Sequence, residues 1–311
     1  MMRFFIHEYR KNRMPLATLF LFMFASVLAG VSGVADAAGA AEANGDAAGH
    51  DAASLRAQYA ALAPQLRNNQ FQRPLTLQST ESSGRLRGDI YAVLDHPFSS
   101  VNSAFNGPAH WCDMLILHLN TKYCRATNTG SHDQLQVAIG KKTDEPLSSA
   151  YRVNFNFAVA AATPDYLDVV LNARDGPMGT SDYRIMLEAA ALPDGHTFLH
   201  LTYSYAYGMA ARLATQAYLS TVGSGKVGFT KTGNDYIGGV RGVVERNTMR
   251  YYLAIDSYLA AGAATGAQQL DRRLESWFTA TERYPRQLHE VERVEYFDMK
   301  RSEYKRQQTA Q

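Results

Sequence analysis

The stretch GDIYAVLDHPFSSVNSAFNGPAHW, residues 88–111, decides how the fold begins. Residues 88–94 alternate apolar and polar side chains, which predicts a strand with one buried face. His96-Pro97 ends that strand, because the residue before a proline is restricted in its backbone conformation. Residues 98–105 then predict one or two helical turns, and a second short helical piece follows at 109–113. The chain therefore starts a sheet and leaves it at once for short helices.

Residues after 113 predict an antiparallel sheet. Short runs of alternating apolar and polar residues are separated by turns rich in Gly, Asp and Pro, which is typical of a meander. We expect strands at 114–123, 134–141, 151–159, 166–173, 183–191 and 197–208.

Helical periodicity dominates the two ends of the chain. Residues 54–66 predict a helix with Ser54 as its N-cap, and 243–259 predict the longest helix. Shorter helices are expected at 210–220, 270–278 and 288–299, with a glycine-rich loop at 223–239. We expect a single domain over 54–299, with a C-terminal helical extension, and a polar tail at 300–311 that frays.

This order of elements resembles the START-like helix-grip fold of the SRPBCC, or polyketide cyclase-type, superfamily. The resemblance rests on residues 88–111, which end in Pro108-Ala109-His110-Trp111, and on the last strand at 197–208; it covers about residues 84–260. It implies an α+β fold in which a curved antiparallel sheet wraps around a long C-terminal helix and leaves a cavity for an apolar ligand. Additional helices before and after 243–259 depart from that pattern and leave open which helix is gripped.

The first 38 residues predict a signal peptide. Basic side chains lie within residues 1–13, an uncharged apolar run covers 16–34, and Ala35-Asp36-Ala37 offers a cleavage site. Residues 39–53 are rich in Ala, Gly and Asp and predict a flexible linker. We expect a periplasmic protein with no transmembrane span after cleavage. The alternative is an uncleaved anchor helix, because the apolar run approaches spanning length.

Composition and charge exclude several classes of protein. The chain has 311 residues, of which 46% are hydrophobic and 19% charged, as in ordinary globular proteins. Its net charge is +2, and residues 1–38 hold four basic and two acidic side chains, so the rest of the chain is neutral. A neutral domain lacks the basic face that nucleic acids require, and we expect no nucleic-acid partner.

Cys112 and Cys124 are the only cysteines. In an oxidising compartment two cysteines this close in sequence predict a disulfide. The bridge requires a bend between them, since a strand of this length would hold its ends about 30 Å apart. The spacing matches neither a redox C-x-x-C pair nor a zinc knuckle.

Candidate ligand-binding residues come from three segments. Polar and aromatic side chains cluster near residues 110–122, strand 151–159 carries polar residues on one face, and strand 197–208 carries a tyrosine stripe. The candidates are Trp111, His118, Asn120, Arg152, Asn154, Tyr203, Tyr205 and Tyr207. Glu188 is a further polar candidate, and His200 is a possible third ligand if a zinc site existed. The alternative is a solvated sheet face around a buried core.

These observations predict a binding protein that holds or carries an apolar, lipid-like molecule between sheet and helix. We assign no catalytic residue, metal or cofactor. One alternative is an enzyme on the same scaffold with His118 and Asp113 as acid and base. The other is an envelope protein that binds a partner through its C-terminal helices and holds no small ligand. The pattern leaves the ligand and the oligomeric state open.

Overall fold

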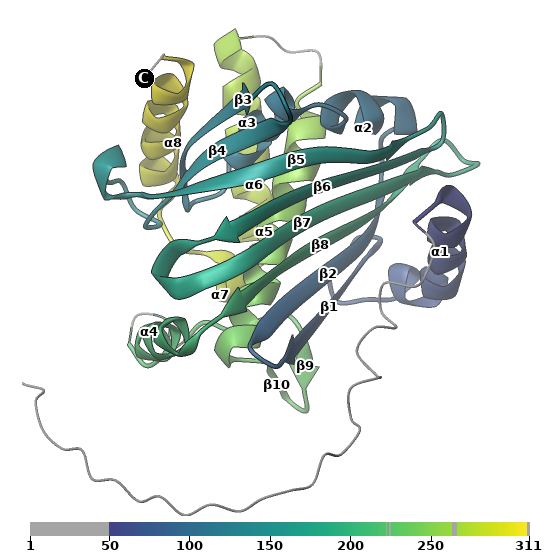
Figure 1. Cartoon of the computed structure of the whole chain (residues 1–311). Coiled ribbons are helices and arrows are strands. Elements are labelled where there is room, and N and C mark those ends of the chain that lie inside the picture. The colour runs from purple at the N-terminus through teal and green to yellow at the C-terminus, as the bar shows by residue number, and fades with distance from the viewer. Residues whose placement is uncertain (1–49, 222, 224, 263–265, 310–311) are drawn as a thin grey trace, which may run out of the picture. The chain divides into compact units, whose positions relative to one another are not determined.

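An eight-stranded antiparallel sheet forms the centre of the protein (Figure 1). The computed structural model describes residues 50–309 apart from 222, 224 and 263–265, so the predicted signal peptide and most of the linker lie outside the described residues. Its strands are β1 Leu75–Ser82, β2 Arg85–Leu94, β3 Thr121–Asn128, β4 Asp133–Ile139, β5 Tyr151–Ala162, β6 Tyr166–Asp175, β7 Thr180–Ala191 and β8 Thr197–Tyr207.

The strand order is β1-β2-β8-β7-β6-β5-β4-β3. After the β1–β2 hairpin the chain crosses to the far edge of the sheet through α2 (Phe98–Phe105) and α3 (Pro108–Leu115). From β3 it returns strand by strand until β8 pairs with β2. The hairpin and the meander are thereby joined into one curved sheet (Figure 1).

Different helices pack on the two faces of the sheet. Leu199 and Leu201 of β8 belong to the main core together with residues of α5 (Gly239–Ala260), which packs on β1, β2 and β8. Phe198, which alternates with them, packs instead against α1 (Ala52–Arg67) on the opposite face. The predicted helix-grip fold class is confirmed, and α5 is the gripped helix.

Further helices, two short strands and two 3₁₀ turns complete the described chain. They are α4 (Met209–Leu219), β9 (Lys231–Thr232), β10 (Asp235–Tyr236), α6 (Gly266–Glu282), α7 (Pro285–Leu288) and α8 (Arg293–Gln308), with short 3₁₀ turns η1 (Leu147–Ser149) and η2 (Pro177–Gly179). Helices α4, α6 and α7 contact α5, and α8 packs on β3. Among the described helices, none combines the length and the apolarity that a membrane span requires.

The predicted strand at 114–123 is wrong. Helix α3 runs through Leu115, a turn follows in which the amide of His118 donates to the carbonyl of Leu115, and β3 begins at Thr121. The predicted disulfide is confirmed, and it explains the bend: the Cα atoms of Cys112 and Cys124 lie 5.1 Å apart, joining α3 to β3.

One strand was missed, and two predictions at the ends are wrong. Strand β1 was not predicted from the sequence. Asp51, not Ser54, caps α1, because its carboxylate accepts the Ser54 amide at 2.7 Å. The segment expected as a frayed polar tail is helical through Gln308, and within it Lys300 and Glu303 are fully buried.

Candidate functional site

An aromatic cluster lines the inner face of the sheet where it meets α5. Tyr203 contacts Tyr183, Tyr205 and Tyr251, with ring centroids 6.2, 5.5 and 5.1 Å apart. His118 stacks on Tyr251 at 4.8 Å. Tyr183, Tyr203 and Tyr205 are buried, and burial raises the pKa of all three hydroxyls. These side chains form an apolar interior with polar tips.

One stripe of α5 remains accessible although the helix is enclosed. Val243, Asn247 and Tyr251 are partly exposed, while the residues around them on α5 are mostly buried. A spacing of four places the three side chains on one face of the helix. That face meets the aromatic cluster through the contact between Tyr251 and Tyr203.

His118 carries an unsatisfied donor. Its Nδ1 accepts the backbone N–H of Asn120 at 3.1 Å, so in the neutral ring the proton lies on Nε2. That Nε2 is buried and has no hydrogen-bond partner within the described part of the chain. Burial, together with the charges of Arg250 and Lys300, lowers the pKa of His118 well below its usual value, which keeps the ring neutral.

Three cations converge beside this cluster, and two of them share one carboxylate. Arg246 and Arg250 lie one turn apart on α5 and are 2% and 1% exposed. Glu290 accepts from Arg250 at 2.8 Å and from Lys142 at 2.6 Å, whereas Arg246 donates to the carbonyl of Val227 at 3.3 Å. The group therefore has a formal excess of two positive charges.

The pKa values respond to that excess. Burial and the charge of Arg250 lower the pKa of Lys142 to about 8, although Glu290 acts in the opposite direction. Burial and Arg250 also lower the pKa of Arg246. Burial alone would raise the pKa of Glu290, but the charges of Arg250 and Lys142 lower it. The local potential is positive in a region with little water to screen it.

The predicted site residues do not all lie here. The structure brings His118, Tyr203 and Tyr205 together. Trp111 is instead a core residue whose Nε1 donates to the carbonyl of Phe105 at 3.0 Å. Asn120 holds the turn before β3 through a 2.5 Å bond to the carbonyl of Gly140.

Tyr207 packs against the same core but its hydroxyl is engaged by Glu81, and the polar residues of β5 lie on the opposite face. Tyr207 is near the end of β8, where its hydroxyl donates to Glu81 at 2.5 Å. Arg152 and Asn154 alternate with the core residues of β5 and are exposed on the opposite face, where they line a surface pocket of about 290 Å³. The expectation that they point into a cavity is corrected, because the pleat turns them outward.

The predicted acid–base pair is not formed. The carboxylate of Asp113 accepts from Arg273 at 3.1 Å, and the hydrogen bond of His118 goes to Asn120. Each group is engaged elsewhere, so the geometry does not couple them for proton transfer.

A second polar cluster lies on the outer face of the sheet. His200 bridges two carboxylates: Nε2 lies 2.8 Å from Asp89 and Nδ1 lies 2.9 Å from Glu188. The ring of Tyr91 stacks on His200 at 4.2 Å, and the hydroxyl of Tyr166 donates to Glu188 at 2.6 Å. Glu188 and His200, considered above as cavity and zinc ligands, are thus occupied with each other. Within the described ranges no group of His, Cys, Asp and Glu side chains is arranged to hold a metal ion.

Hydrogen bonds set the pKa values of this outer cluster. Burial alone would raise the pKa of Asp89 and of Glu188, but hydrogen bonds from His200 and other neighbours lower each to about 2. Burial alone would lower the pKa of His200, but its two carboxylates raise it. The cluster ties β2, β7 and β8 together and has both imidazole nitrogens occupied, so it is not a free catalytic histidine.

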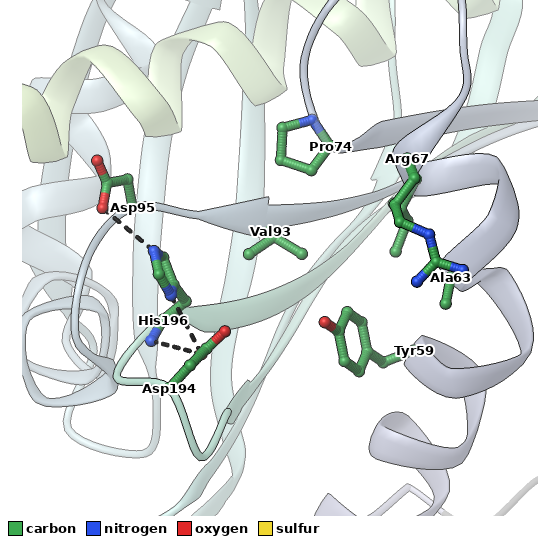
Figure 2. Close-up of a pocket in the computed structure, with 9 residues that line it drawn as sticks. Tyr59, Ala63, Arg67, Pro74, Val93, Asp95, Asp194 and His196 are labelled. Carbon is green, nitrogen blue, oxygen red and sulfur yellow. Dashed lines mark hydrogen bonds and ion pairs between the residues drawn. The ribbon is translucent and has the colours of Figure 1, made fainter.

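A surface pocket of about 290 Å³ lies between α1 and the turn that joins β7 to β8 (Figure 2). Tyr59 and Arg67 of α1 line one side, and Asp95, Asp194 and His196 line the other. His196 lies 3.4 Å from Asp95 and 3.1 Å from Asp194, so two carboxylates surround one imidazole on that side. This acidic side contrasts with the cationic excess at α5.

Sequence reasoning missed the cationic group. A spacing of four between Arg246 and Arg250 was a visible signal, but arginines on a helix usually face solvent. Lys142 and Glu290 lie in loops far apart in sequence, and only the folded chain brings them to α5. The tyrosines of β8 were found because their alternation is a local property.

No family model matches the sequence, and no curated protein matches it. Solved structures that are similar include human StAR-related lipid transfer protein 5, at 10% identity over 66% of this chain and 94% of that chain, with a TM-score of 0.34. A conserved protein from Geobacillus kaustophilus is 14% identical over 56% of this chain and 95% of that chain, with a TM-score of 0.33. Norcoclaurine synthase from Thalictrum flavum is 8% identical over 48% and 81%, with a TM-score of 0.31. Identities this low do not indicate a shared ligand.

Proposed function

We propose that the protein binds an apolar small molecule between the inner face of the sheet and α5. The observation that carries the proposal is an inward polar group without a partner. Nε2 of His118 is buried and unpaired within the described residues, and the ring stacks on Tyr251, which contacts Tyr203. Buried polar groups are normally satisfied, and a group left open in an aromatic interior suits a ligand.

Accessibility supports the same location. Tyr251 is partly exposed although its stacking partners His118 and Tyr203 are buried. Its face of α5 is therefore accessible to a small molecule. A neighbouring element is loosely held: Met209 and Leu213 of α4 are 80% and 61% exposed. We propose that α4 moves to admit the ligand, because an element with so few buried side chains opens at low cost.

Calorimetric titration with 1-dodecanol tests binding without involving charge. Wild-type protein should bind one dodecanol, and Tyr205→Ala, which removes a wall of the interior, should weaken binding. Arg152→Ala is the matched control, because Arg152 lies on the outer face and should leave affinity unchanged. Absence of dodecanol binding, or equal losses in both variants, would contradict the proposal.

Export to the periplasm is a separate proposal that rests on residues 1–38. A fusion of residues 1–60 to alkaline phosphatase, which is active only after export, tests it. Activity that disappears when the apolar run is interrupted by charges supports export, and activity without that run contradicts it. Binding to an envelope partner stays a prediction.

A further inference from the structure

We infer that the ligand carries an anionic head group, a carboxylate or a phosphate monoester, which is held by Arg246, Arg250 and Lys142. The inference rests on the proposed function and extends it to the chemical class of the ligand. The charge of the site favours an anion. Lys142 and Arg250 share a single carboxylate, Glu290, whereas Arg246 donates to the carbonyl of Val227 and has no ion pair with a described residue. The two arginines are almost fully buried. Buried charge is costly unless it is compensated, and an incoming anion supplies the missing compensation.

The unpaired hydrogen-bonding groups also favour an anion. Nε of Arg250 is buried and has no partner in the described part of the chain, and an arginine nitrogen can only donate. Nε2 of His118 carries the proton, since Nδ1 accepts from Asn120, so it too is an open donor. Both unpaired buried groups at this site are hydrogen-bond donors. A ligand that fits them must therefore supply hydrogen-bond acceptors. Oxyanions bring several acceptors at once and match the planar guanidinium.

The position of the site favours an apolar body as well. Tyr251 stacks on His118 and follows Arg250 directly on α5, and the charge of Arg246 is felt by Tyr205. The cationic group therefore adjoins the aromatic interior. A molecule with one acidic end and one apolar body satisfies both halves, and neither a fully apolar molecule nor a small inorganic anion does.

The rival reading is that the cations only stabilise the fold. Two contacts favour it: Arg250 donates to the carbonyl of Leu288 at 3.3 Å and to Glu290. Lys142 donates to Glu290 and to the hydroxyl of Tyr218 at 3.2 Å, but 24% of its side chain is exposed, and Arg246 donates to the backbone carbonyl of Val227. These two residues are the ones to vary, because their loss is less disruptive to folding than the loss of Arg250.

Calorimetric titrations with dodecanoate, dodecyl phosphate and 1-dodecanol test the inference at pH 7. Wild-type protein should bind at least one of the two anions about tenfold or more tightly than dodecanol, as charge-assisted hydrogen bonds predict. The better anion identifies the head group as carboxylate or phosphate. Arg246→Gln and Lys142→Met should each reduce anion affinity by about tenfold and leave dodecanol affinity unchanged. Far-UV circular dichroism establishes that the variants are folded.

Arg212→Gln is the matched control, since Arg212 is an exposed cation on α4 outside the group. It should leave all three affinities unchanged. Equal affinity for anions and dodecanol would overturn the anionic head group and leave the proposed function standing. Failure of all three probes would overturn both, and equal losses in Arg212→Gln would show general electrostatic attraction instead of a built site.

Discussion

Replacing Lys142 by Met should stabilise the ligand-free protein. Charging Lys142 in the folded state is unfavourable, because its pKa falls from 10.5 to about 8. At about 1.4 kcal/mol per pH unit, that difference corresponds to about 3 kcal/mol of folding free energy at pH 7. The contact of the ammonium with the Tyr218 ring at 5.4 Å is lost in the variant, and the expected net gain is smaller, about 2 kcal/mol. For a domain of this size that raises the melting temperature by about 5 °C.

The stabilisation expected for Lys142→Met depends on pH. A lowered pKa in a base means that the folded state carries a penalty while the group is charged. The penalty is complete below pH 8 and disappears as pH rises toward 10.5, so the advantage of Lys142→Met should shrink over that range. Urea unfolding at pH 7 and pH 10 measures both values. A variant less stable than wild type at pH 7 would refute the reasoning, because Lys142 would then be a structural partner of Glu290.

Three other perturbations have definite outcomes. Glu303→Gln should lower the free energy of unfolding by about 3–5 kcal/mol, because it leaves the buried Lys122 and Lys300 without their carboxylate. A loss below about 1 kcal/mol in urea unfolding would contradict this and would support the frayed tail expected from the sequence. His200→Gln should cost most stability below pH 6.5 and progressively less as pH rises through the raised pKa of His200; a loss that does not change between pH 6 and 9 would contradict this. The double variant Cys112→Ser, Cys124→Ser should lose about 3 kcal/mol, and an unchanged melting temperature would show that the bridge contributes nothing to stability.

Hydrogen exchange tests the proposed movement of α4. Its amides should exchange faster than those of α5 in the free protein, because few α4 side chains are buried. Saturating dodecanoate should slow exchange in α4. Slow exchange in both states, with binding intact, would show that the ligand enters elsewhere.

The fold was predictable wherever its signal was local. Alternation located β4 to β8, and periodicity located α5, because each pattern is written in neighbouring residues. The predicted strand at 114–123 was wrong because Leu115, Leu117 and Leu119 alternate as in a strand, while a disulfide and a turn bend the chain. The prediction of a frayed tail at the end of α8 was wrong for another reason. The polar side chains there are buried only because Lys122 and Glu303, which are far apart in sequence, pair in the folded state.

The candidate site was predictable only in part. Tyr203 and Tyr205 followed from strand alternation, and His118 lies beside them although the strand assigned to it does not exist. The prediction for Arg152 and Asn154 was wrong because they alternate with Val153 and Phe155, whose apolar face packs on the core and leaves the polar face outward. The cationic group needs α5 and two distant loops together, which no local pattern encodes.

Native mass spectrometry of the protein, purified without detergent and then extracted with organic solvent, tests the central claim most directly. We expect a stoichiometric adduct whose extract is an acidic amphiphile, and we expect Arg246→Gln to lose it. A bare protein mass that also takes up neither dodecanoate nor dodecanol in the same spectrometer would contradict the account.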